Sequence, residues 1–148
     1  MLKSLNNNVE TKKKVAIYVS PYSKQNDKEC YSNEEQERLI REYCINNNLE
    51  VYKCYSDNLS ETSFLNNKPS LEELLNDSKD KKFDKVITFK LKCLSKKLKD
   101  ILKIISIFDD NTITFNSYSE PFETDTPVGK MQFQMMEMTV RFQKKFDN

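Results

Sequence analysis

Four cysteines and three arginines are the side chains of this 148-residue chain with the most specific chemistry. The cysteines are Cys30, Cys44, Cys54 and Cys93, and no two of them have the CxxC spacing typical of a zinc site. The chain contains no histidine, which excludes serine–histidine and cysteine–histidine catalysis. We therefore expect buried thiols, no bound metal and no cofactor.

Phosphate recognition by this chain would have to rely on lysine. Arg38, Arg41 and Arg141 are few for a site that clamps phosphate with bidentate guanidinium groups. The net charge is only +1, whereas nucleic-acid-binding domains usually carry a clear basic excess. The single glycine, Gly129, excludes a glycine-rich phosphate loop, and with it P-loop and Rossmann nucleotide binding.

The elements that must position any site alternate between strand and helix. Short apolar, β-rich runs predict strands at 15–20, 49–56, 83–89 and 112–117. Apolar stripes at helical spacing predict helices at 33–46, from 69, at 96–108 and at 128–146. Ser32 and Glu35 form a capping box before the first helix. This alternation predicts an α/β fold with a mostly parallel sheet of four to five strands and helices on both faces.

The domain organisation follows from length and composition. The polar residues 1–13 predict a flexible tail, and 14–148 predict one domain. No apolar stretch approaches the ~20 residues that span a bilayer, and the first residues lack the apolar segment of a signal peptide. We expect a cytoplasmic protein with no membrane partner.

Six segments, in order, resemble the motifs of the serine site-specific recombinases, the resolvase/invertase family, and especially the catalytic domain of its large phage-type members. They are AIYVSPYS (16–23), SNEEQERLIREYC (32–44), YSDNLSETSF (55–64), KPSLEELLND (68–77), FDKVITFKLKCLSKKLKD (83–100) and SEPFETDTPVGKMQFQMM (119–136). The resemblance implies the three-layer resolvase fold. It also implies a reaction in which a serine hydroxyl attacks a DNA phosphate to form a 5′-phosphoserine, while arginines stabilise the transition state.

The same resemblance places the nucleophile on a residue that is not serine. The family serine falls on Tyr22 and the arginine before it on Ser20, with Tyr18 holding the register. Ser20 and Ser23 are the nearest hydroxyl groups that could replace the missing serine. The simpler interpretation is that all three are polar residues at the end of a strand.

Other active-site positions are also substituted. The family arginines fall on Lys68, Cys93 and Lys96, and the glutamate–arginine pair of the last helix falls on Gln143 and Lys144. Lysine keeps the positive charge but loses the bidentate fork of arginine. We expect the remaining site to be a poor clamp for phosphate.

Gln36 and Asp57 do match family residues, and the core positions stay apolar. Because the substitutions fall on the active site and spare the packing, we expect a catalytically inactive recombinase domain, a pseudoenzyme from a mobile element or prophage, or a gene in early decay. It would act through protein–protein association.

The resemblance also implies partners. DNA is the family substrate, but near-zero net charge and the apparent lack of a C-terminal DNA-binding domain weaken that expectation here. We expect the last helix, Val128–Phe146, to be truncated relative to the family. It carries a Met/Phe stripe. We expect this stripe to be core or the face of a homodimer, or of a heteromer with another recombinase.

Two other functions stay open. The chain could be an active recombinase that uses a nearby serine, or Tyr22, as nucleophile. It could instead be a phosphate- or small-ligand-binding module that uses Lys68 and Lys96, with Lys90 and Lys92 beside them. A solvated lysine-rich face is the simpler interpretation of these lysines.

Overall fold

The computed structural model describes residues 11–22, 30–58 and 68–146. Its strands are β1 (Lys14–Val19), β2 (Glu50–Ser56), β3 (Lys85–Thr88), β4 (Thr114–Ser117) and β5 (Phe122–Glu123). They form one sheet in the order β2-β1-β3-β4-β5, in which only the β4–β5 pair is antiparallel. The predicted α/β architecture and mostly parallel sheet are confirmed, and β5 is a short strand that no sequence pattern indicated.

Four α-helices and one 3₁₀ turn complete the described structure. They are α2 (Asn33–Asn46), α3 (Pro69–Lys79), η1 (Leu91–Cys93), α4 (Leu98–Asp110) and α5 (Pro127–Phe146). The prediction that a helix begins at Lys96 was wrong by two residues. The N–H of Lys97 donates to the Ser95 hydroxyl, and Lys97 itself is extended, so the helix starts only at Leu98.

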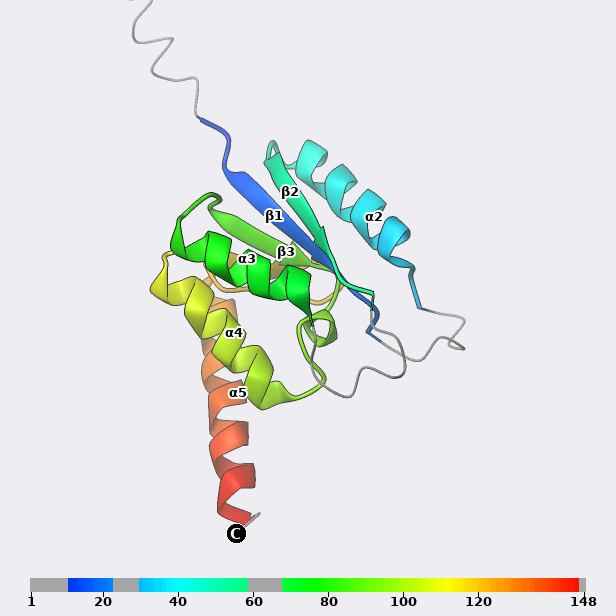
Figure 1. Ribbon diagram of the computed structural model, residues 1–148. Helices are drawn as coiled ribbons and strands as arrows, with labels where there is room; N and C mark the ends of the chain where they lie inside the picture. The colour runs from blue at the N-terminus through cyan, green and yellow to red at the C-terminus, as the bar shows by residue number, and fades with distance from the viewer. Residues whose placement is uncertain (1–10, 23–29, 59–67, 147–148) are drawn as a thin grey trace, which may run out of the picture.

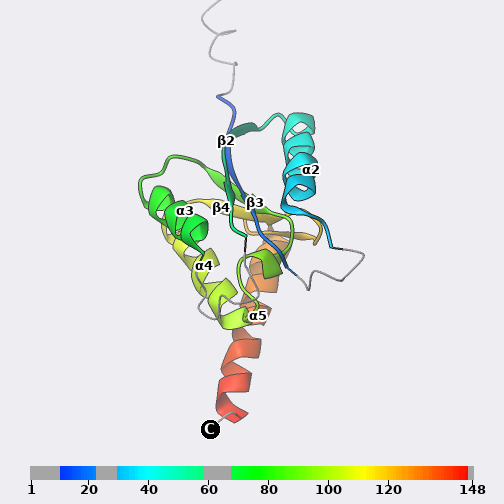
Figure 2. The ribbon, with the colours of Figure 1, turned by 45° about the vertical axis from the view of Figure 1, so that its right-hand side comes forward.

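The sheet is covered on both faces, as alternation of side chains along a buried strand requires. On one face, β1 contributes Val15, Ile17 and Val19, which pack against Ile40 and Cys44 of α2. On the other face, Ala16 and Tyr18 of β1 join a core that includes residues of α3 and α4. Figure 1 and Figure 2 show α2 on one side of the sheet and α3 and α4 on the other.

Helix α5 packs along α4 through Phe133 and Met136, and its C-terminal half projects beyond the rest of the domain (Figure 1). The first turn of α5 lies directly against β5. A side chain at Gly129 would overlap the backbone carbonyl of Glu123, so the single glycine of the chain is required by this close approach.

Candidate functional site

Polar residues from several segments meet where β1, β2 and β3 end. Ser20 follows β1, Asp57 follows β2, and Cys93 lies in η1 after β3. All three are buried, and so is Lys68, the residue before α3. In open α/β sheets this carboxyl edge is the usual place for a ligand.

Ser20 is completely buried and its hydroxyl is used inside the protein. The Oγ donates a hydrogen bond of 2.7 Å to the backbone carbonyl of Cys93. The Gln36 amide on α2 donates to the carbonyls of Ser20 and Tyr31, both at 3.0 Å. The Cys93 thiol lies 3.7 Å from Gln36 Oε1, which completes a closed link between β1, α2 and η1. In this arrangement the Ser20 hydroxyl faces the interior.

Lys68 is the cation nearest to this link. Its ammonium donates to the carbonyl of Cys93 at 3.1 Å and to that of Leu94 at 2.8 Å, and the residue is only 7% exposed. Burial, opposed by Cys93 and Asp57 and assisted by the nearby charge of Lys96, lowers the pKa of Lys68. The lysine therefore stabilises the turn after β3 from within.

Asp57 anchors the start of α3. Its carboxylate accepts the N–H groups of Ser70 and Leu71 at 2.9 and 3.0 Å, and also the Tyr18 hydroxyl at 2.7 Å. A carboxylate at a helix N-terminus satisfies unpaired donors and interacts favourably with the helix dipole. Burial and this hydrogen bond strongly raise the pKa of Tyr18, so the phenol stays protonated. Nothing in the sequence pattern had indicated a role for the Tyr18 hydroxyl.

Tyr22 lies outside the buried cluster, in a pocket of about 520 Å³. Its ring stacks on Phe89 with a centroid distance of 5.6 Å, and its hydroxyl accepts the Tyr31 N–H at 2.9 Å. The Lys90 ammonium lies 5.4 Å from the centre of the Tyr22 ring. Burial raises the pKa of Tyr22, which disfavours the phenolate needed for nucleophilic attack.

Cys93 is the residue to which the sequence resemblance assigns a family arginine. Burial raises the pKa of its thiol from 9.0 to about 11, so the residue is neutral at physiological pH. It contributes neither charge nor a strong donor to the edge of the sheet.

The remaining predicted residues are not part of this cluster. Lys96 is exposed. Gln143 and Lys144 are exposed near the end of α5, and no hydrogen bond or ion pair joins them to the other described site residues. Ser23 lies outside the described residues. Of the ten positions that the sequence grouped, the structure joins Ser20, Gln36, Lys68 and Cys93 by hydrogen bonds into one polar network. Asp57 lies close enough to affect the pKa of Lys68.

No group of three histidine, cysteine, aspartate or glutamate side chains in the described part of the chain could hold a metal ion. None of the described helices is both long and apolar enough to cross a membrane.

The chain is similar in sequence and in structure to known proteins. Residues 18–146 match the sequence model of the family described as "Resolvase, N terminal domain". The structure is similar to the N-terminal catalytic domain of TP901-1 integrase, with a TM-score of 0.81 and 27% identity over 92% of this chain and 100% of that one. No curated protein sequence is significantly similar.

Two further solved structures share the fold at lower identity. A resolvase family site-specific recombinase from Streptococcus pneumoniae has a TM-score of 0.77 at 20% identity and covers 90% of this chain and 89% of its own. The C-terminal catalytic domain of ISC1926 TnpA, an IS607-like serine recombinase, has a TM-score of 0.59 at 12% identity over 86% and 98%.

Proposed function

Because the chain belongs to the resolvase N-terminal domain family, we propose that it is a serine recombinase catalytic domain that does not cleave DNA. The observation that carries the proposal is Tyr22. The family resemblance assigns the nucleophile to this position, and here it is a stacked phenol whose pKa is raised by burial. A protonated phenol that accepts a backbone hydrogen bond is a weak nucleophile for phosphoryl transfer.

The charges at the edge of the sheet support the same conclusion. Cleavage needs fixed cations aimed at a phosphate that enters from outside. The Lys68 ammonium is directed at two backbone carbonyls, and Cys93 offers a neutral thiol. Removing one donor of this kind typically costs about 2.7–4 kcal/mol of transition-state stabilisation. The loss of several together would reduce cleavage far below a measurable rate.

Ser20 is a poor replacement nucleophile. Its hydroxyl is fully buried and donates to the Cys93 carbonyl, so attack on DNA would require the β1–η1 link to open. Any such attack would still lack arginine at the positions of Lys68, Cys93 and Lys96.

A covalent-trap experiment tests the proposal. The protein is incubated with pooled supercoiled DNA, quenched with denaturant, and examined for protein joined to a 5′ DNA end. We expect no adduct, while a recombinase with an intact active site gives one under the same conditions. An adduct mapped to Ser20, Tyr22 or Ser23 would contradict the proposal and identify the nucleophile.

We further propose that the domain self-associates through α5. Val128, Met131, Met135 and Met138 are 58%, 55%, 59% and 65% exposed, and their three- and four-residue spacing aligns them in one stripe. Phe133 and Met136 on the opposite side pack toward the core. A row of exposed large apolar side chains on a projecting helix is typical of an interaction surface.

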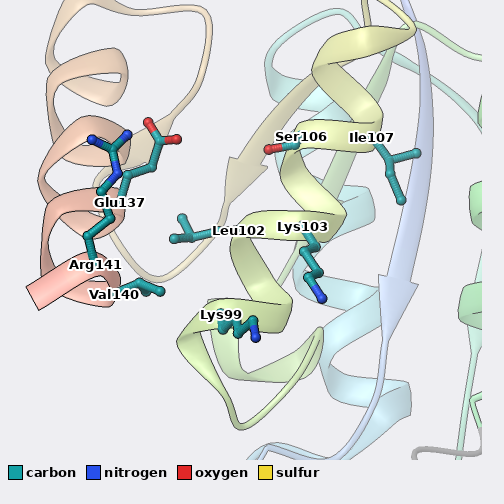
Figure 3. A pocket seen from close by; sticks show the side chains of 8 residues that line it. All are labelled: Lys99, Leu102, Lys103, Ser106, Ile107, Glu137, Val140 and Arg141. Carbon is teal, nitrogen blue, oxygen red and sulfur yellow. The ribbon is translucent and has the colours of Figure 1, made fainter. Parts of the chain in front are cut away.

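A groove between α4 and α5 adds apolar surface. Leu102 and Ile107 of α4 and Val140 of α5 contribute to its lining, together with the charged residues Lys99, Lys103, Glu137 and Arg141 (Figure 3). The stripe lies on α5 and the groove between α4 and α5, so a second copy of the chain that packs on α5 could contact both. We propose a homodimer as the occupant, because a two-fold pair would bring two identical apolar stripes into contact.

A further inference from the structure

An aromatic cluster lies at the carboxyl edge of the sheet, outside the polar network. Phe89, which is 3% exposed, forms its base after β3. The ring of Tyr118 stacks on Phe89 at 5.6 Å, and the ring of Tyr31 meets it at 5.0 Å. The two tyrosines remain 36% and 43% exposed, so each has ring surface in contact with solvent. Tyr43 supports Tyr118 edge-on at 6.0 Å.

The backbone that carries these two tyrosines is fixed by hydrogen bonds. The N–H of Tyr118 donates to the Thr88 carbonyl at 2.8 Å, which continues the pairing of β4 with β3. The carbonyl of Tyr31 accepts the Gln36 amide at 3.0 Å, and its N–H donates to the Tyr22 hydroxyl at 2.9 Å. We call Phe89, Tyr31 and Tyr118 the platform. Because its backbone is already ordered, binding a flat ligand would lose little conformational entropy in the protein.

The pocket beside the platform has the size and the mixed polarity of a ligand site. Its volume of about 520 Å³ is within the range typical of small-molecule sites. It is the pocket that holds Tyr22, and Tyr31 and Phe89 also form part of its lining. The lining residues that the structure describes include one cation, Lys90, which lies 5.4 Å from the centre of the Tyr22 ring, and one carboxylate, Glu35. A carboxylate beside a single ammonium would repel the closely spaced phosphates of a duplex. The same pair suits a ligand with one phosphate, for Lys90, and one hydrogen-bond donor, for Glu35.

We infer that this platform binds an unpaired nucleotide of a DNA strand. The base stacks on the exposed ring of Tyr31, and the Lys90 ammonium pairs with one phosphate. The Glu35 carboxylate accepts a hydrogen bond from an amino group of the base. Adenine and guanine both supply a large stacking surface and such an amino group, so purine-containing single strands are the expected ligands. Base stacking on aromatic side chains is a usual means by which proteins hold single strands.

Fluorescence anisotropy with labelled single-stranded (dA)12 tests this inference. We expect the full chain to bind the single strand more tightly than the (dA)12·(dT)12 duplex, and unlabelled dAMP to compete for the site. Because a single phosphate is paired with Lys90, the slope of log Kd against log salt should be only about 0.7.

Substitutions at Tyr31 and at Tyr52, two tyrosines of similar exposure, distinguish a loss of base stacking from a general loss of stability. Tyr31→Ala should weaken binding at least about fivefold, the lower end of the effect of losing one stacked base. Tyr31→Phe keeps the ring and should bind like the wild type. Tyr52→Ala removes a tyrosine that is 40% exposed on β2 and packs near Phe83 on the opposite core, so it should leave binding unchanged.

Several results would overturn the inference. Equal affinity of the single strand and the duplex, failure of dAMP to compete, or equal effects of Tyr31→Ala and Tyr52→Ala would each do so. The inference goes beyond the proposed loss of cleavage and does not depend on it. A covalent adduct would refute the proposed function while leaving strand binding intact, and absence of strand binding would leave the adduct result unchanged.

Discussion

The ammonium of Lys68 lies 3.1 Å from the backbone carbonyl oxygen of Cys93 and donates a hydrogen bond to it. Both residues occupy positions that the family resemblance assigns to arginine. Here the side chain of one donates a hydrogen bond to the backbone of the other. A second hydrogen bond from Lys68, to the carbonyl of Leu94, fixes the turn that follows β3. The contact explains how a charged side chain can be almost completely buried at this edge.

Replacing Lys68 by methionine should destabilise the domain. The Leu94 carbonyl loses its side-chain donor, and an unsatisfied buried acceptor costs about 1–3 kcal/mol. Lys92→Met, at an exposed position in η1, is the matched control and should change the free energy of unfolding by less than about 0.5 kcal/mol. Urea denaturation of both variants measures the difference. Equal stabilities would mean that the Lys68 hydrogen bonds are not structural.

Asp57→Asn should weaken the start of α3. The wild-type carboxylate accepts three hydrogen bonds, two from the N–H groups of Ser70 and Leu71 and one from Tyr18. An amide has one acceptor oxygen, so at least one donor loses its partner, at a cost of about 1–3 kcal/mol. Thermal unfolding compared with the exposed Asp109→Asn variant checks this expectation. If both variants melted together, the capping role would be wrong.

Cys93 should make the stability fall at alkaline pH. Its pKa is raised from 9.0 to about 11 in the folded state, so between these values the unfolded thiol ionises while the folded thiol keeps its proton. The unfolded state then binds fewer protons, and the free energy of unfolding decreases as pH rises. The contribution of Cys93 is fully present below pH 9.0 and is lost through about pH 11, on the order of 2–3 kcal/mol.

The Cys93→Ala variant isolates this effect from other groups. Its stability should lie below that of the wild type at neutral pH, and the difference should narrow between pH 9.0 and about pH 11. Chemical denaturation at several pH values provides the measurement, with Cys30→Ala as a control at a partly exposed thiol. A difference that stays constant across this pH range would contradict the predicted linkage.

Tyr22→Ser alone should not restore DNA cleavage. The substitution would supply a hydroxyl, but Lys68 would still be bonded to backbone carbonyls and Cys93 would still be neutral. The covalent trap described above is the appropriate assay. A 5′ adduct on this single variant would show that the other substitutions are tolerated by the chemistry.

Charge placed on the α5 stripe should abolish self-association. Met135→Lys combined with Met138→Lys introduces two like charges into the proposed dimer face, where they would be desolvated and would repel their copies. Light scattering coupled to size-exclusion chromatography should report a dimer for the wild type and a monomer for the variant. Gln143→Lys, exposed on the same helix but off the stripe, should remain dimeric. A monomeric wild type would refute the homodimer.

The sequence by itself determined the elements and the faces that they bury. Apolar β-rich runs indicated the four main strands, and apolar stripes at helical spacing indicated the four α-helices. Ser32 accepts the Glu35 N–H at 3.2 Å, as its capping pattern predicted. Ile40 and Cys44 are buried on α2, as the apolar stripe required. The helices depend on residues three or four positions apart, and the strands on short runs of neighbouring residues. Local sequence is therefore sufficient to specify both.

Only the tertiary structure decided what the site residues do. Ser20 and Cys93 are 73 residues apart, Lys68 and Cys93 are 25 apart, and no local pattern states that they are bonded. The same holds for Tyr22, Tyr31 and Tyr118, whose rings come from three separate segments and all meet Phe89. It also holds for β5, whose two residues form a strand only because they pair with β4. Contacts of this kind arise when the sheet brings strand ends together, and their partners are therefore set by topology.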